Sequence, residues 1–119
     1  MKYMLLIHQG TTPTPRSPEK WAKLSEEEQK AVFADYQAIN ETAGVSSGLQ
    51  LDAPETATTV RVQDGKTLTT DGPFVEIKES IGGYLTFEAG DLDAAIDLAS
   101  RIPAARLGGA VEVRPIVEW

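Results

Sequence analysis

The polar segment from Asp71 to Glu79 has the residue types needed for acid–base chemistry. Gly72 and Pro73 constrain it to a turn, and Glu76 and Lys78 project to the same side of an extended chain because they are two residues apart. Carboxylates grouped around one ammonium can shift a pKa or orient a cationic or hydroxylated ligand. The alternative to a functional site is a solvent-exposed loop whose surface ion pairs contribute little to stability. We predict a ligand site whose contacts are Asp71, Phe74, Glu76, Lys78 and Glu79.

Three further residues outside this segment could take part in chemistry. His8 is the single histidine of the chain and ends an apolar run, and its ordinary pKa of about 6.5 suits proton transfer near neutrality. We predict His8 and Asp71 as catalytic residues, the alternative for His8 being a hydrogen-bonded structural role. Arg61 could bind a carboxylate or phosphate, and Tyr84, which follows two glycines, could line a pocket. Their alternatives are an exposed strand position for Arg61 and buried aromatic packing for Tyr84.

Composition limits the class of protein. The chain has 119 residues, 18 acidic and 11 basic, and a formal net charge of −7, which argues against nucleic acid or an anionic membrane as a partner. With no cysteine and one histidine, it has no thiolate zinc site, cysteine nucleophile or multi-histidine metal cage. We therefore expect no metal and no cofactor. The longest apolar run, Tyr3 to Ile7, is too short for a membrane span or a signal peptide, so a cytoplasmic location is expected.

Local patterns define the elements that must position these residues. Residues 2–9 read as a strand that is apolar on both faces. Ser17-Pro18 opens a short helix. Ser25 and Glu28 form a capping box at the start of a longer helix that runs to Gly44, with Val32, Tyr36 and Ile39 on its apolar stripe.

The second half of the chain alternates in the same way. Residues 58–63 show the pattern of a half-buried strand, and Asp64-Gly65 predicts a type I′ turn into a return strand over residues 66–70. A strand over residues 82–88 follows. Asp91 then caps a helix that ends at Pro103. The stripe predicted for this helix is Leu92, Ala95, Ile96, Ala99 and Ile102. Residues 110–118 form the last strand, placed at an edge or a bulge by Pro115.

The order β-α-β-hairpin-β-α-β predicts an α+β fold. Two split β-α-β units with an inserted β-hairpin give a ferredoxin-like antiparallel sheet with both helices on one face, in a single domain spanning residues 1–119. The first strand is apolar on both faces, so the face without helices should pack on a second sheet. We expect a homodimer with facing sheets, the alternative cover being a proline-rich segment folded back.

The segment Asp71-Gly72-Pro73-Phe74 with the following Val-Glu-Ile-Lys-Glu resembles the signature of the DGPF proteins, a branch of the YCII-related family. The resemblance extends over nearly the whole chain, from the opening Met-Lys-Tyr-Met-Leu-Leu-Ile to residues 111–115. It implies a ferredoxin-like fold that forms a dimeric α+β barrel, and it implies no general activity. Some relatives carry a His and an Asp near the first long helix. This chain has no histidine between Pro13 and Gly44, so that pair is not carried over.

Three functions remain open at this stage. The first is a dimer that binds a small molecule in a cleft near the Asp71–Glu79 turn, with enzyme-like acid–base chemistry. The second is an accessory partner of an extracytoplasmic-function sigma factor, which rests on the genomic context that the resemblance implies. The third is a cofactor-free monooxygenase, by analogy with other dimeric α+β barrels. We favour the first, and the residues leave open whether the protein is an enzyme.

Overall fold

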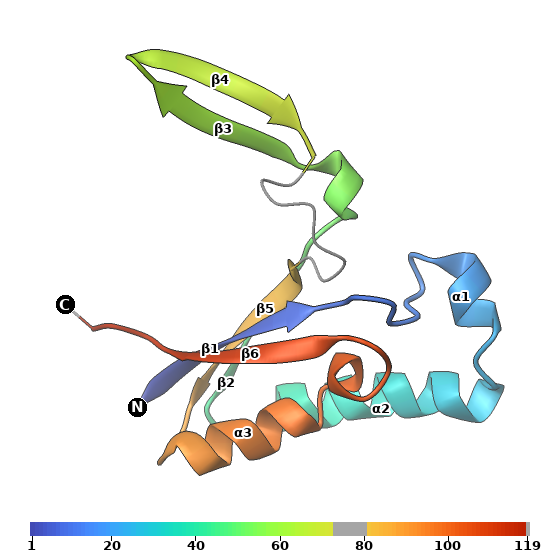
Figure 1. The fold of residues 1–119 in the computed structure, drawn as a ribbon. Coiled ribbons are helices and arrows are strands. Elements are labelled where there is room, and N and C mark those ends of the chain that lie inside the picture. The colour runs from blue at the N-terminus through green and yellow to red at the C-terminus, as the bar shows by residue number, and fades with distance from the viewer. Residues whose placement is uncertain (73–80, 119) are drawn as a thin grey trace.

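The computed structural model describes residues 1–72 and 81–118. In this part of the chain, strands and helices follow one another in the predicted α+β order (Figure 1). The elements are β1 (Lys2–His8), α1 (Pro18–Ala22), α2 (Glu26–Glu41), β2 (Val45–Gln50), the 3₁₀ helix η1 (Pro54–Thr56), β3 (Thr58–Gln63), β4 (Lys66–Asp71), β5 (Ile81–Glu88), α3 (Leu92–Ser100), the 3₁₀ helix η2 (Pro103–Ala105) and β6 (Ala110–Pro115).

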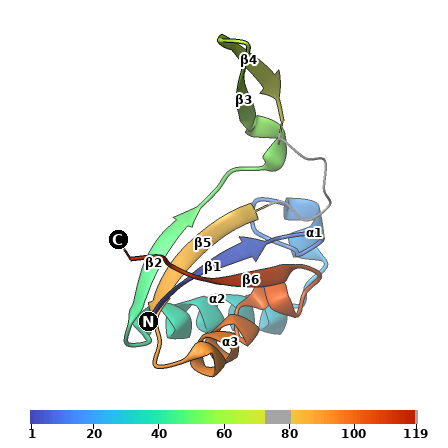
Figure 2. The same ribbon diagram turned by 60° about the vertical axis from the view of Figure 1, so that its left-hand side comes forward.

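Four of the strands form one antiparallel sheet in the order β2-β5-β1-β6. This order is that of a ferredoxin-like fold, with β1 and β5 in the centre. In two views 60° apart, α2 and α3 lie on the same side of the sheet (Figures 1 and 2). The predicted fold class is therefore confirmed, and β6, with Pro115 at its end, lies at an edge as expected.

The hydrophobic core lies between the sheet and the two long helices. Because side chains alternate along a strand, the odd-numbered residues of β1 point toward the helices, and Leu5 is fully buried opposite Leu85 of β5. From the helices, Ile39 and Leu98 complete the same cluster. These residues are exposed to solvent by 4% or less, so they fix the position of α2 and α3 on the sheet.

The capping box that starts α2 is present as predicted. The backbone N–H of Glu28 donates to Ser25 Oγ at 3.1 Å, and the backbone N–H of Ser25 donates to Glu28 Oε1 at 3.4 Å. The two bonds satisfy free donors at the helix start. The helix ends at Glu41, three residues before Gly44. At the start of α3, Asp91 accepts from the backbone N–H of Ala94 at 2.8 Å, which confirms it as the cap.

The stripe predicted for α3 is partly wrong. Ala95, Ala99 and Ile102 are buried, but Leu92 and Ile96 are about half exposed, and the fully buried Leu98 takes part in the core instead. The helix is nine residues long, and only a narrow face of it packs on the sheet. That face is centred between Ala95 and Leu98, so Leu92 and Ile96 lie at its margin.

The hairpin of β3 and β4 projects away from the sheet and helices in both views (Figures 1 and 2). Its turn has positive φ at Asp64 and Gly65, as the predicted type I′ turn requires, and Gln63 pairs with Lys66. Val60 and Val62 are 60% and 69% exposed, so the prediction of a half-buried strand is wrong for this single chain. The projection contributes to a radius of gyration of 16.1 Å, against about 13.5 Å for a compact domain of this length.

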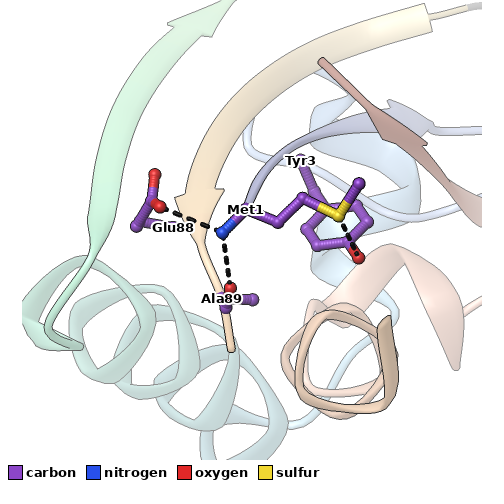
Figure 3. Close-up of polar contacts among 4 residues, drawn as sticks. All are labelled: Met1, Tyr3, Glu88 and Ala89. Atoms are coloured by element: carbon purple, nitrogen blue, oxygen red, sulfur yellow. Dashed lines mark hydrogen bonds and ion pairs between the residues drawn. The ribbon is translucent and has the colours of Figure 1, made fainter. Parts of the chain in front are cut away.

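Met1 forms polar contacts with the C-terminal end of β5 and the residue that follows it (Figure 3). The N-terminal ammonium of Met1 donates to the carbonyl of Ala89 and to Glu88 Oε1, each at 3.0 Å. The Tyr3 hydroxyl lies 3.2 Å from Met1 Sδ. These contacts hold β1 in register with β5 at the end of the sheet opposite to the site described next. Of the helices described, none is long and apolar enough to cross a membrane.

Candidate functional site

A cleft of about 310 Å³ opens at the end of the sheet where β1 stops and β5 begins. It lies between the sheet, the loop over residues 9–15, helix α2 and strand β2. This volume is at the lower end of the range for small-molecule sites. Apolar side chains make much of the wall: Ile7, Pro13, Val32, Phe33, Leu85 and Pro103. Polar residues also line it: Gln9, Thr12, Thr14, Tyr36, Asn40, Ser47, Gln50 and Tyr84.

Two glycines at the cleft leave room for neighbouring atoms: Gly48 for the backbone of β5, and Gly82 for the side chain of Gln9. A Cβ atom on Gly48 would overlap the carbonyl oxygen of Tyr84, so β2 can reach this position on β5 only without a side chain. A Cβ on Gly82 would overlap Cγ of Gln9, whose side chain therefore lies directly over Gly82. The pairing of β1 with β5 shifts register here, between Ile7 and His8. The glycine-rich entry of β5 thus shapes the wall and places Gln9 in it.

Two polar atoms of cleft residues are buried without a hydrogen-bond partner among the described residues. They are Gln9 Oε1 and the Thr12 hydroxyl oxygen. Thr12 is 6% exposed, and its hydroxyl lies toward Gly109, while its backbone N–H donates to the carbonyl of Gln9 at 2.8 Å. Buried polar groups in folded proteins are nearly always satisfied, and an exception is expected to have a reason.

Contacts around the cleft fix its rim. Ser47 Oγ donates to Asn40 Oδ1 at 2.9 Å, which ties β2 to α2. The ring of Trp21 packs edge-on against Phe33, with centroids 5.5 Å apart. Tyr36 is half-buried, and burial raises the pKa of its hydroxyl above the ordinary value.

His8 lies on the opposite face of the sheet from the helices. Its side chain is 16% exposed, and its Nε2 lies 3.2 Å from Glu112 Oε1 on β6. The other carboxylate oxygen of Glu112 pairs with Arg114 Nε. The hydrogen bonds from Arg114, first, and from His8 lower the pKa of Glu112. An imidazole oriented by a carboxylate is an arrangement that general acid–base catalysis uses.

The site residues predicted from the sequence do not lie together in the structure. Tyr84 lines the cleft, and its partner across the strands is Leu6 of the open face. His8 does not line the cleft, although its neighbours Ile7 and Gln9 do. Asp71 and Arg61 lie on the projecting hairpin, where both are exposed. The predicted contacts Phe74, Glu76, Lys78 and Glu79 lie outside the described residues.

Sequence reasoning missed Gln9, Thr12 and Tyr36 as site residues. Gln9 and Thr12 follow directly after an apolar strand. Polar residues just beyond the end of a strand often belong to binding loops, and this position could have indicated them as site residues. Tyr36 was assigned to the apolar stripe of α2, where only its hydroxyl distinguishes it from a core residue. Within residues 1–72 and 81–118, no group of three or more His, Cys, Asp or Glu could hold a metal ion.

The fold and cleft together define a small ferredoxin-like α+β protein with a cavity at one end of its sheet, whose lining among residues 1–72 and 81–118 has no charged side chain. The family model of the YCII-related domain matches residues 1–119. The chain is also similar to the uncharacterised protein R00369 of Rhizobium meliloti (strain 1021), with 33% identity over 121 residues, which cover 98% of this chain and 92% of that protein. The chain therefore belongs to the YCII-related family, as its motifs indicated.

Proposed function

We propose that this protein binds a small organic molecule in the cleft at the end of the sheet. The observation that carries the proposal is the cleft itself, which has a volume of about 310 Å³ and an apolar wall interrupted by polar residues. A concave, mostly apolar site with a few polar groups is the form that small-molecule sites take.

The cleft is also close in the sequence to the Asp71–Glu79 segment. Gly82 and Gly83, which line it, follow shortly after Glu79 in the chain. At the other end of that turn, the backbone N–H of Gly72 donates to the carbonyl of Ala57 at 2.7 Å, and Thr59 Oγ1 donates to the carbonyl of Gly72 at 2.7 Å. These bonds hold the backbone of Gly72 against the start of β3. Contact of the ligand with the turn is part of the proposal.

A fragment screen followed by NMR tests this proposal. In ¹H–¹³C spectra of the wild-type chain, the methyl signals of Ile7, Val32 and Leu85 should shift with any fragment that enters the cleft. The methyl signals of Val60 and Val62, on the hairpin, serve as the control and should stay in place. A broad panel of neutral and charged fragments that leaves the first group of signals unchanged would contradict the proposal.

We further propose that two copies pack through the face of the sheet that lacks helices. This face presents Met4 and Leu6 of β1 with Tyr84 of β5, all partly buried although no described helix lies over them. Facing sheets pack about 10 Å apart, which would bury these side chains in both copies. The polar cluster of His8, Glu112 and Arg114 would border the contact. The acid–base role proposed for His8 would then belong to the dimer.

The dimer is tested by mass. Sedimentation or light scattering at micromolar concentration should give twice the 12.8 kDa of one chain. Leu6→Glu should reduce the mass to that of a monomer, because a buried carboxylate without a partner opposes association. Ile96→Glu is the matched control, since Ile96 is 50% exposed on α3, away from the sheet face. A monomeric wild-type chain would refute the dimer and leave the cleft untouched.

A further inference from the structure

The single chain exposes more surface than a folded monomer of its size. Its accessible surface is 8196 Å², whereas a monomer of 12.8 kDa exposes about 6,300 Å², so the excess is about 1,900 Å². Counting the nine residues outside residues 1–72 and 81–118 as fully exposed, at about 150 Å² each, still leaves an excess of about 900 Å² for the others. A standard protein interface takes about 800 Å² from each partner, so the excess is large enough for a stable dimer.

The hairpin of β3 and β4 is one source of this excess. Every residue of β4 is exposed, and on β3 the side chains of Val60 and Val62 are 60% and 69% exposed. Thr69 and Thr67 lie directly opposite these two valines on β4, so four β-branched side chains share one face, here called the Val60 face. Such side chains suit a covered sheet surface, and a two-stranded hairpin is only marginally stable until another element packs on it.

The hairpin projects toward the side of the sheet that carries no helix. In both views α2 and α3 lie below the sheet and the hairpin lies above it (Figures 1 and 2). A second copy packed on the open face of the sheet, about 10 Å away, would lie on that same side. Each strand of the hairpin has six residues and spans about 20 Å, which is longer than the spacing between two facing sheets.

We infer that the hairpin is an arm whose Val60 face packs against the second copy of the chain. This inference rests on the proposed dimer through the open face of the sheet and goes beyond it by assigning a second contact surface. In a twofold dimer the contact forms twice, because each copy contributes one arm and receives the other. Since β4 ends at Asp71, packing of the arm on the partner also fixes the start of the Asp71–Glu79 segment.

A dimer assembled from labelled and unlabelled chains shows which copy the arm contacts. Wild-type protein with ¹³C-labelled methyl groups is mixed with an equal amount of unlabelled wild-type protein, and an isotope-filtered NOE spectrum detects contacts between the two kinds of chain. The methyl signals of Val60 and Val62 should show contacts with protons of the unlabelled chain. The methyl signals of Ile96 are the control and should show none, because Ile96 is on α3, away from the open face.

Val62→Thr tests whether the arm stabilises the dimer. Threonine keeps the β-branched shape that suits a strand, so the hairpin itself should persist, and cross-strand NOEs check this. The substitution places a hydroxyl in the contact in both copies, so the dissociation constant of the dimer should rise by at least about 10-fold. Gln63→Thr is the matched control, because Gln63 is exposed and points to the opposite face of the hairpin. Its dissociation constant should stay within about 3-fold of that of the wild type.

The outcomes separate the arm from the dimer. A dimer in which the Val60 and Val62 methyl groups make no contact with the unlabelled chain, or in which Val62→Thr leaves the dissociation constant unchanged, would overturn the arm and leave the sheet interface intact. Association that survives Leu6→Glu and is lost in Val62→Thr would refute the sheet interface while the arm contact stands. A wild-type chain that is monomeric at micromolar concentration would overturn both.

Discussion

Replacing Thr12 by valine should stabilise the protein, which is the opposite of what this substitution usually does. Threonine and valine have nearly the same shape, so Thr12→Val exchanges a hydroxyl for a methyl group in a residue that is 6% exposed. The Thr12 hydroxyl has no partner among the described residues, so its hydration is lost on folding without a compensating bond. The backbone hydrogen bond from Thr12 to Gln9 does not involve the side chain and should remain.

The size of the effect follows from the cost of an unsatisfied buried hydroxyl. That cost is about 1–3 kcal/mol, and the added methyl group is buried in its place. We expect a gain of about 1–2 kcal/mol in the free energy of unfolding. For a chain of this length, a gain of about 1 kcal/mol corresponds to a rise of about 4 °C in Tm.

Urea unfolding and thermal melts, at one fixed protein concentration because the chain is proposed to dimerise, measure this change. Thr42→Val is the matched control. The Thr42 hydroxyl donates to the carbonyl of Ala38 at 2.8 Å, so its removal should cost about 0.5–1.5 kcal/mol. If Thr12→Val is destabilised as much as Thr42→Val, the Thr12 hydroxyl has a partner in solution.

Two further predictions concern other parts of the molecule. In the Leu6→Glu chain, which is expected to be a monomer, Leu5→Ala, at a fully buried position, should lower the free energy of unfolding by about 2–5 kcal/mol, whereas Val62→Ala, at a 69% exposed position on the hairpin, should lower it by less than about 0.5 kcal/mol. A large loss for Val62→Ala in urea unfolding of that chain would show that the hairpin is covered by its own copy in solution. Glu112 has a lowered pKa in the folded chain, so its ionised form stabilises the fold above the ordinary carboxyl pKa, and that contribution is lost as the pH falls through the lowered value. Wild type should therefore lose its advantage over Glu112→Gln as the pH falls below about 5, and a difference that is constant with pH would exclude this linkage.

Much of the fold could be predicted from the sequence because its signals are local. The capping box at Ser25, the Asp64-Gly65 turn and the Asp91 cap each depend on residues within four positions of one another. Alternation along β1 gave both the buried face and the open face. The exposure of Val60 and Val62 could not be predicted in this way. An alternating strand pattern predicts which residues share a face. Whether another element covers that face depends on where the strand lies in the tertiary structure.

The cleft was harder to predict because its residues come from separate segments. Gln9 and Thr12 follow β1, Tyr36 is on α2, and Gly82 is the second residue of β5, so no spacing rule connects them. The unpartnered state of Gln9 Oε1 is also a property of the assembled structure. The charged residues of the Asp71–Glu79 turn attracted attention in the sequence, whereas the described wall of the cleft is marked by the absence of charge.

Strand β1 connects the cleft to the proposed dimer interface. Ile7 and Gln9 belong to the cleft, whereas Leu6 and His8 belong to the open face, since successive side chains of a strand point to opposite sides. Tyr84 takes part in both, because it lines the cleft and pairs across the strands with Leu6. A second sheet packed on Leu6 and Tyr84 would thus contact the same strands that form part of the cleft wall. If both proposals hold, dimerisation and ligand binding are coupled, and each must raise the affinity of the other by the same factor or lower it by the same factor.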